Sequence, residues 1–198
     1  MKTKNLLKAK PVGGWGLTRL VGYTEELLYQ SMVFEGVKYN RHWNGGGWVA
    51  ETAEVDETAF VGFFAMVKDR ARVKNRAIIE DYAIISDDAQ VYGNAQVYGR
   101  ALVYGKAEVY GSARIFNDAQ VYREARVSDD VHVFKNARVY GKAKVYGEAW
   151  ITDNAQVYED ARVCGNTTIN NNIEVFGKAY ISNNNQLTSG SLWIRPAL

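Results

Sequence analysis

Side chains that could act as a base or a nucleophile are scarce, because the 198 residues include only two histidines and one cysteine. His132 lies in Val131-His-Val-Phe-Lys-Asn and His42 in Tyr39-Asn-Arg-His-Trp-Asn. Both are weak candidates for a catalytic base. The position of His132 is elsewhere occupied by Gln, Arg and Glu, which favours an ordinary surface residue. His42 precedes a glycine-rich turn, and packing within an N-terminal cap is the favoured interpretation.

The other reactive groups point away from catalysis. A nucleophilic thiol needs a nearby base that lowers its pKa, and the sequence places none beside Cys164, so we expect an inert surface thiol. One cysteine excludes an intrachain disulfide framework, and no His/Cys/Asp cluster has metal-ligand spacing. Gly45-Gly46-Gly47 lacks the Lys-Ser/Thr of a phosphate loop and is interpreted as a turn.

Aromatic residues show a more informative spacing, because they recur every 18 residues in separate columns. Two columns form the candidate binding surface: Tyr104, Tyr122, Tyr140, Tyr158 and Phe176, and Tyr98, Phe116 and Phe134. Stacked aromatic side chains can simply stabilise neighbouring strands. Alternatively, they form a contact surface for a protein partner, a sugar or a base. Both interpretations remain open at this point.

A six-residue repeat must position these columns. From residue 53 to residue 190 the chain contains 23 consecutive hexads without an insertion. The third position is Val, Ile or Leu in all 23 hexads, and the first is Ala in 19. These two positions face one side of a strand, whereas a six-residue period would drift around a helix. Gly, Asn or Asp in the fifth position suits a tight corner.

Three hexads close a triangular coil of 18 residues, and successive coils stack about 4.8 Å apart. The sequence therefore predicts an all-β, triangular solenoid of about eight coils. Outward residues 18 apart should stack, and Val91, Val109 and Val127 should line one inner column.

The repeat, as in Ala89-Gln-Val-Tyr-Gly-Asn and Ala95-Gln-Val-Tyr-Gly-Arg, resembles the hexapeptide-repeat proteins of the bacterial transferase type. The resemblance covers residues 53–190, about 70% of the chain. It implies a left-handed parallel β-helix, although the general crossover preference is right-handed. The Ala-x-Val-Tyr-Gly form is most similar to uncharacterised bacterial and phage repeat proteins. Gly46-Gly47-Trp48-Val49-Ala50-Glu51 resembles the segment that often precedes their repeats.

The same resemblance implies two functional alternatives. Transferases of this type are usually trimers that use acyl-coenzyme A and a histidine base to acylate a hydroxyl or an amine. An unbroken repeat without an extruded histidine loop instead favours a non-catalytic binding or scaffold protein. A phage-type protein of this kind could block or sequester a host component. No cofactor is expected unless the acyltransferase alternative holds.

The ends of the chain are expected to cap the repeat. Residues 1–52 form an N-terminal cap, 53–190 the β-helix and 191–198 a C-terminal cap. An apolar patch gathers near the N-terminal end, either under the cap or in a subunit interface: Phe60, Phe63, Phe64, Met66, Ile78, Ile84 and Leu102.

Composition limits the remaining classes of function. A net charge of +2 does not favour a dedicated nucleic-acid binder. No apolar run approaches the roughly 18 residues of a membrane span, and the N-terminus lacks a signal-peptide core. We therefore expect a cytoplasmic protein that does not contact membranes. The outward aromatic residues predict self-association, with a homotrimer as the expected state. A foreign protein partner is the alternative.

Overall fold

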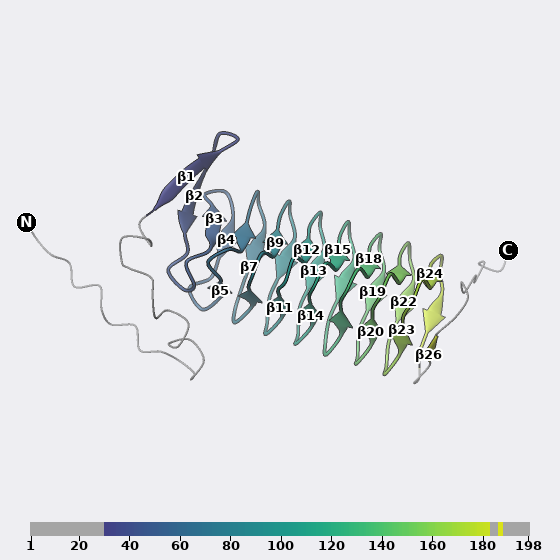
Figure 1. Ribbon diagram of the computed structural model, residues 1–198. Coiled ribbons are helices and arrows are strands. Elements are labelled where there is room, and N and C mark those ends of the chain that lie inside the picture. Colours follow the sequence, from purple (N-terminus) through teal and green to yellow (C-terminus); the bar gives the residue numbers. More distant parts are fainter. Residues whose placement is uncertain (1–29, 183–185, 188–198) are drawn as a thin grey trace, which may run out of the picture.

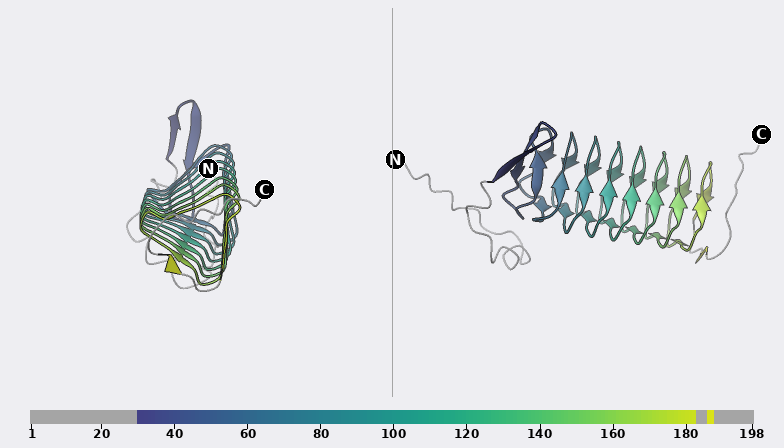
Figure 2. Two further views of the ribbon diagram at one scale, coloured as in Figure 1. Left: turned by 90° about the vertical axis from the view of Figure 1, so that its right-hand side faces the viewer. Right: turned by 45° about the horizontal axis from the view of Figure 1, so that its top comes forward.

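A computed structural model describes residues 30–182 and 186–187 of the chain, and every regular element in these ranges is a β-strand. Most strands are two residues long and alternate with corners, so that the chain winds into a stack of three-sided coils (Figures 1 and 2). The predicted all-β, parallel β-helix is confirmed. No helix in the described ranges is long and apolar enough to cross a membrane.

Three sheets form the sides of this stack. Face 1 consists of β1 (Ser31–Phe34), β2 (Val37–Arg41), β3 (Trp48–Ala50), β6 (Met66–Val67), β9 (Ile84–Ile85), β12 (Leu102–Val103), β15 (Gln120–Val121), β18 (Arg138–Val139), β21 (Gln156–Val157) and β24 (Glu174–Val175). Face 2 consists of β4 (Glu54–Val55), β7 (Arg72–Val73), β10 (Gln90–Val91), β13 (Glu108–Val109), β16 (Arg126–Val127), β19 (Lys144–Val145), β22 (Arg162–Val163) and β25 (Tyr180–Ile181). Face 3 consists of β5 (Phe60–Val61), β8 (Ile78–Ile79), β11 (Gln96–Val97), β14 (Arg114–Ile115), β17 (His132–Val133), β20 (Trp150–Ile151), β23 (Thr168–Ile169) and β26 (Gln186–Leu187).

Parallel strands on each face are in register at a spacing of 18 residues. Val91 pairs with Val109 and Val109 with Val127, and all three side chains are fully buried. The predicted inner column is therefore confirmed. Alanine beside most corners and an aliphatic residue in the middle of each side fill the narrow interior, because both positions point inward while their neighbours point outward.

The corners depend on the fifth position of the hexad, where the backbone is left-handed. Gly99 has a φ of 73°, and a Cβ atom there would lie 2.8 Å from the backbone nitrogen of Asn117 in the next coil. Asp81 occupies the same corner one coil earlier with a φ of 54°. Its Oδ2 accepts a hydrogen bond of 3.0 Å from the Gly99 N–H. Asp and Asn at this position thus bond one coil to the next, as well as tolerating the left-handed backbone.

The N-terminal end is covered by antiparallel structure. The hairpin β1–β2 extends face 1 beyond β3 and projects past the outline of the coils (Figure 2). The glycine-rich segment then runs along β5, where the Gly47 N–H donates to Val61 O at 2.8 Å and the Val61 N–H to Asn44 O at 3.0 Å. Glycine is required here because a Cβ atom at Gly45 or Gly47 would overlap the backbone of β5. These bonds occupy a strand edge that would otherwise be open.

The parallel register begins before the first hexad of the repeat. β3 pairs with β6, with Trp48 beside Met66 and Val49 beside Val67, so the first parallel strand lies inside the segment 1–52 that the sequence assigns to the cap. The C-terminal cap expected at residues 191–198 lies outside the described residues.

Candidate binding surface

A ladder of five parallel aromatic rings runs along face 1. The centroids of successive rings are 4.8 Å apart from Tyr104 through Tyr158 and 5.0 Å apart at the last step to Phe176. The planes of neighbouring rings differ by only 1° to 7°. The predicted stacking of outward residues 18 apart is confirmed. All five rings occupy the fourth position of their hexads, just before a corner.

Hydroxyl groups of the ladder are held by the next coil. The Tyr140 hydroxyl donates to Gln156 Oε1 at 3.1 Å, and the Tyr158 hydroxyl donates to Glu174 Oε2 at 3.0 Å. Burial, followed by the contact with Glu174, raises the pKa of Tyr158 to about 12. Burial also raises the pKa of Tyr104 and of Tyr140. The ladder is thus a fixed, half-buried row of four phenol rings that ends at Phe176.

Stacking determines what this surface can offer to a ligand. Parallel rings with centroids 4.8 Å apart form an offset stack, in which each ring covers much of its neighbour's face. Solvent therefore meets mainly ring edges and hydroxyl groups along the ladder. Such a surface suits a flat protein interface better than the insertion of a sugar or base between or over the rings.

Face 3 carries a shorter ladder that ends at Trp150. The rings of Tyr98, Phe116 and Phe134 stack at 4.9 Å, and Trp150 then meets Phe134 edge-on at 5.8 Å. The indole is 45% exposed. His132 lies between Phe116 and Trp150, and its Nδ1 is 3.1 Å from the carbonyl oxygen of Asp130. This weak catalytic candidate is half-buried on an open face.

The second weak candidate, His42, belongs to the segment that covers β5. Its Nδ1 lies 3.1 Å from Asn44 O, and burial lowers its pKa. The structure separates the two histidines, because His42 follows β2 at the N-terminal end of the stack and His132 lies on β17, a little more than halfway along the repeat.

Cys164 on face 2 is not the surface thiol that the sequence predicts. Its side chain points outward in the predicted column but is only 6% exposed, because Tyr146 and Tyr180 cover it. Its Sγ lies 3.4 Å from the Tyr180 hydroxyl. The hydrogen bond with Cys164 is the main reason that the pKa of Tyr146 rises to about 12. The thiol is therefore a covered one rather than the surface thiol that its position suggested.

The apolar patch at the N-terminal end divides between two faces. Phe60 pairs with Ile78 on face 3, whereas Met66, Ile84 and Leu102 form one half-buried column on face 1. The described residues of the cap contact part of it. The Arg41 guanidinium lies 4.0 Å from the Phe63 ring centroid and 3.7 Å from that of Trp48.

Phe63 also contacts one of a pair of solvent-exposed rings, Phe64 and Tyr82. Phe63 meets Phe64 edge-on at 5.3 Å, and Phe64 stacks on Tyr82 at 5.2 Å. Phe64 is 58% and Tyr82 60% exposed, so this corner of the patch is open to solvent.

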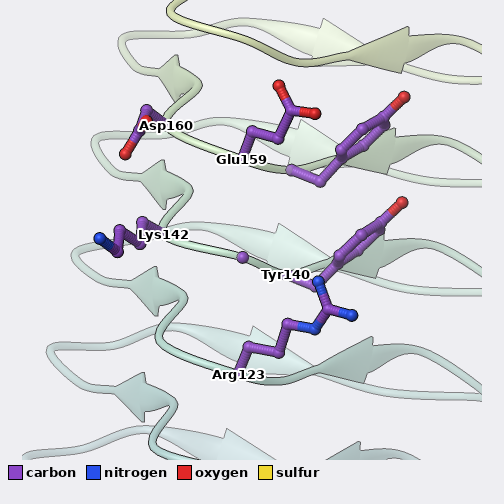
Figure 3. A pocket seen from close by; sticks show the side chains of 7 residues that line it. Arg123, Tyr140, Lys142, Glu159 and Asp160 are labelled. Carbon is purple, nitrogen blue, oxygen red and sulfur yellow. The ribbon is translucent and has the colours of Figure 1, made fainter.

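A hollow of about 430 Å³ lies at the corner between faces 1 and 2, beside the face 1 ladder (Figure 3). Its lining combines two rings of the ladder with charged corner residues: Arg123, Tyr140, Gly141, Lys142, Tyr158, Glu159 and Asp160. The Arg123 guanidinium lies 5.9 Å from the Tyr140 ring centroid. Sequence reasoning missed this hollow. The sequence does contain a signal for it, because Gly141, which has no side chain, stands between Arg123 and Glu159 when outward residues are counted at a spacing of 18.

Within the described ranges, no group of three or more His, Cys, Asp and Glu side chains is arranged to hold a metal ion. The surface itself offers ring edges, phenol hydroxyls and the charged groups of the corner hollow.

Comparison with known proteins agrees with the architecture. A family described as the YdcK Beta solenoid repeat matches residues 95–111, within the most regular part of the repeat. Comparison with curated proteins and with solved structures gives no match. The family match and the register of the three parallel faces identify the chain as a β-helix repeat protein.

Proposed function

We propose that this chain is a non-catalytic binding or scaffold protein that engages a protein partner through face 1. The observation that carries the proposal is the ladder from Tyr104 to Phe176, a straight, fixed row of ring edges and hydroxyl groups. Tyrosine is enriched at protein interfaces, where it supplies contact area at a small cost in side-chain entropy.

The apolar part of face 1 extends beyond the ladder. Trp48, Met66, Ile84 and Leu102 are paired in one half-buried column that leads from β3 to the rung of Tyr104. The face therefore offers an apolar track along most of the stack. Burying several hundred square ångströms of it would contribute several kcal/mol at about 25 cal/mol per Å², before the costs of association.

Two kinds of partner fit the proposal. A second copy of the chain would give the homotrimer expected from the hexapeptide-repeat resemblance. A foreign protein would fit the phage-type alternative, in which the solenoid blocks or sequesters a host component in the cytoplasm. Ring edges and hydroxyls on a flat face support either kind of protein partner.

The test compares matched pairs of substitutions on two faces. Tyr122→Glu with Tyr140→Glu disrupts face 1, and Tyr92→Glu with Tyr110→Glu places the same change in a stacked pair on face 2. Light scattering and affinity capture from the host cytoplasm are then compared for the two double variants and the original protein. We expect only the face 1 variant to show a smaller assembly mass in light scattering or to fail to capture a partner. An equal effect of both pairs, at equal thermal stability, would contradict the assignment to face 1.

A second candidate function is acyl transfer from acyl-coenzyme A, as in the hexapeptide-repeat transferases. One observation favours it. The Asp130 carbonyl can only accept a hydrogen bond, so the contact at 3.1 Å makes His132 Nδ1 the donor. In the neutral ring this leaves Nε2 as the basic nitrogen. Calorimetry with coenzyme A separates the candidates, because saturable binding that depends on His132 would support the transferase.

A further inference from the structure

The corner hollow beside the ladder contains four exposed charges of both signs. Arg123 lies on the lower coil, Lys142 on the middle coil, and Glu159 and Asp160 on the upper coil (Figure 3). Their formal charges cancel. The hollow is therefore positive on the side of the earlier coils and negative on the side of the later ones.

Opposite charges 18 residues apart form ion pairs at several other places on the described surface. These pairs are Glu54–Arg72 at 3.4 Å, Arg70–Asp88 and Arg100–Asp118 at 2.7 Å, Glu108–Arg126 at 3.2 Å, and Lys135–Asp153 at 2.6 Å. Lys142 and Asp160 have the same spacing and occupy the same corner column as Arg70 and Asp88. No ion pair within 4.0 Å joins them, nor does one include Arg123 or Glu159 among the described residues.

The other two charges are separated by a full coil that carries a glycine at their position. Arg123 and Glu159 belong to one column but are two coils apart, and Gly141 between them has no side chain. Its φ is 71°, and a Cβ atom there would lie 2.7 Å from the backbone nitrogen of Glu159. The Glu159 carboxylate is oriented by the Gly177 N–H, which donates to Oε2 at 2.9 Å. The gap is thus a fixed feature of the corner, with backbone as its floor and two tyrosine rings as its wall.

We propose that this hollow binds a segment of a protein partner that carries a carboxylate and a cationic group close together. The carboxylate would lie against Arg123 and Lys142, and the ammonium or guanidinium group against Glu159 and Asp160. A purely anionic or cationic segment would meet like charge on one side, so the arrangement selects a segment of mixed sign. This inference rests on the proposed function, since the hollow borders the same tyrosine ladder.

Capped tetrapeptides serve as probes. Their binding to the full chain labelled with ¹⁵N is measured by NMR as a change in the chemical shift of the Gly141 amide. The mixed-sign peptide Glu-Ala-Ala-Lys is compared with Glu-Ala-Ala-Glu, Lys-Ala-Ala-Lys and the neutral Gln-Ala-Ala-Gln. Exposed ion pairs are individually weak, so we expect a Kd on the order of 1–10 mM for the mixed-sign peptide. It should bind roughly threefold or more tightly than the others and lose this advantage in about 0.5 M NaCl.

Single substitutions test the residues. Lys142→Gln and Arg123→Gln should each weaken binding of the mixed-sign peptide about two- to fivefold. Lys106→Gln is the matched control, because Lys106 is exposed in the same corner column but does not line the hollow. Equal shifts with all four peptides, or equal losses from Lys142→Gln and Lys106→Gln, would overturn the inference.

The Gly141 readout also separates this inference from the proposed function. If the face 1 variants keep their partner while the mixed-sign peptide still selects the hollow, the proposed function fails and the charge selectivity stands. If face 1 proves to be the partner site but the four peptides do not differ, the inference about the hollow is wrong.

Discussion

Val109→Asp tests whether the interior holds the solenoid together. Val109 is fully buried between Val91 and Val127 of the neighbouring coils. The substitution removes about 1.5–3 kcal/mol of apolar burial. An unpaired carboxylate in this interior adds several kcal/mol of desolvation. A domain has a free energy of unfolding of only about 5–15 kcal/mol, so this loss is comparable with the entire stability of the fold.

The size of the destabilisation caused by Val109→Asp also depends on the linear stacking of the coils. Each coil contacts only its neighbours, so a defect in the middle divides the stack into two shorter blocks. Neither block keeps the full set of neighbour contacts. We therefore expect Val109→Asp to be insoluble, or to show a reduced β-sheet signal in circular dichroism and no cooperative melt.

Two further variants separate charge from shape. Val109→Ala leaves a cavity without a charge and should cost about 1–3 kcal/mol, measured as a lower urea midpoint. Gln96→Asp places the same carboxylate on an outward position of face 3 and should change stability by less than about 0.5 kcal/mol. A soluble Val109→Asp protein with unchanged circular dichroism and melting temperature would refute the role given to the interior.

Three other outcomes follow from the outward residues. Light scattering at micromolar concentration should give a mass near three chains, and Tyr122→Glu with Tyr140→Glu should lower it; a clean monomer would refute self-association. His132→Ala should leave the biological activity essentially intact, and a loss of about a hundredfold or more with the fold preserved would favour the transferase instead. The pKa of Tyr158 is raised to about 12 in the folded chain, against about 10 when unfolded, so unfolding favours its ionisation. This contribution to stability is complete below about pH 10 and is lost as the pH rises toward 12, and Tyr158→Phe should flatten that fall in the urea midpoint.

The six-residue period determined the architecture by itself. A small residue and an aliphatic residue two positions apart fix which side of each strand faces inward, and an uninterrupted frame fixes the register of every coil on the next. The buried column of Val91, Val109 and Val127 and the ring ladder of face 1 follow from counting by 18. Local periodicity is enough here because the three-dimensional neighbours are set by a constant sequence separation.

The details of the outward surface required the tertiary structure. Contacts also form diagonally at a separation of 16, as between Tyr140 and Gln156 or between Cys164 and Tyr180, and these depend on side-chain length and direction. For this reason the thiol is covered although its column is outward.

The corner hollow shows the same limit. A count of charges describes the corner as balanced, but only the side-chain directions reveal that Lys142 and Asp160 do not pair with each other, whereas Arg70 and Asp88 meet at 2.7 Å. The hairpin β1–β2 and the glycine-rich cover of β5 likewise lie outside the repeat, so no periodicity placed them. The sequence thus determined the strands and the core through a repeated local rule. The tertiary structure decided the surface, where each side chain responds to neighbours that differ from coil to coil.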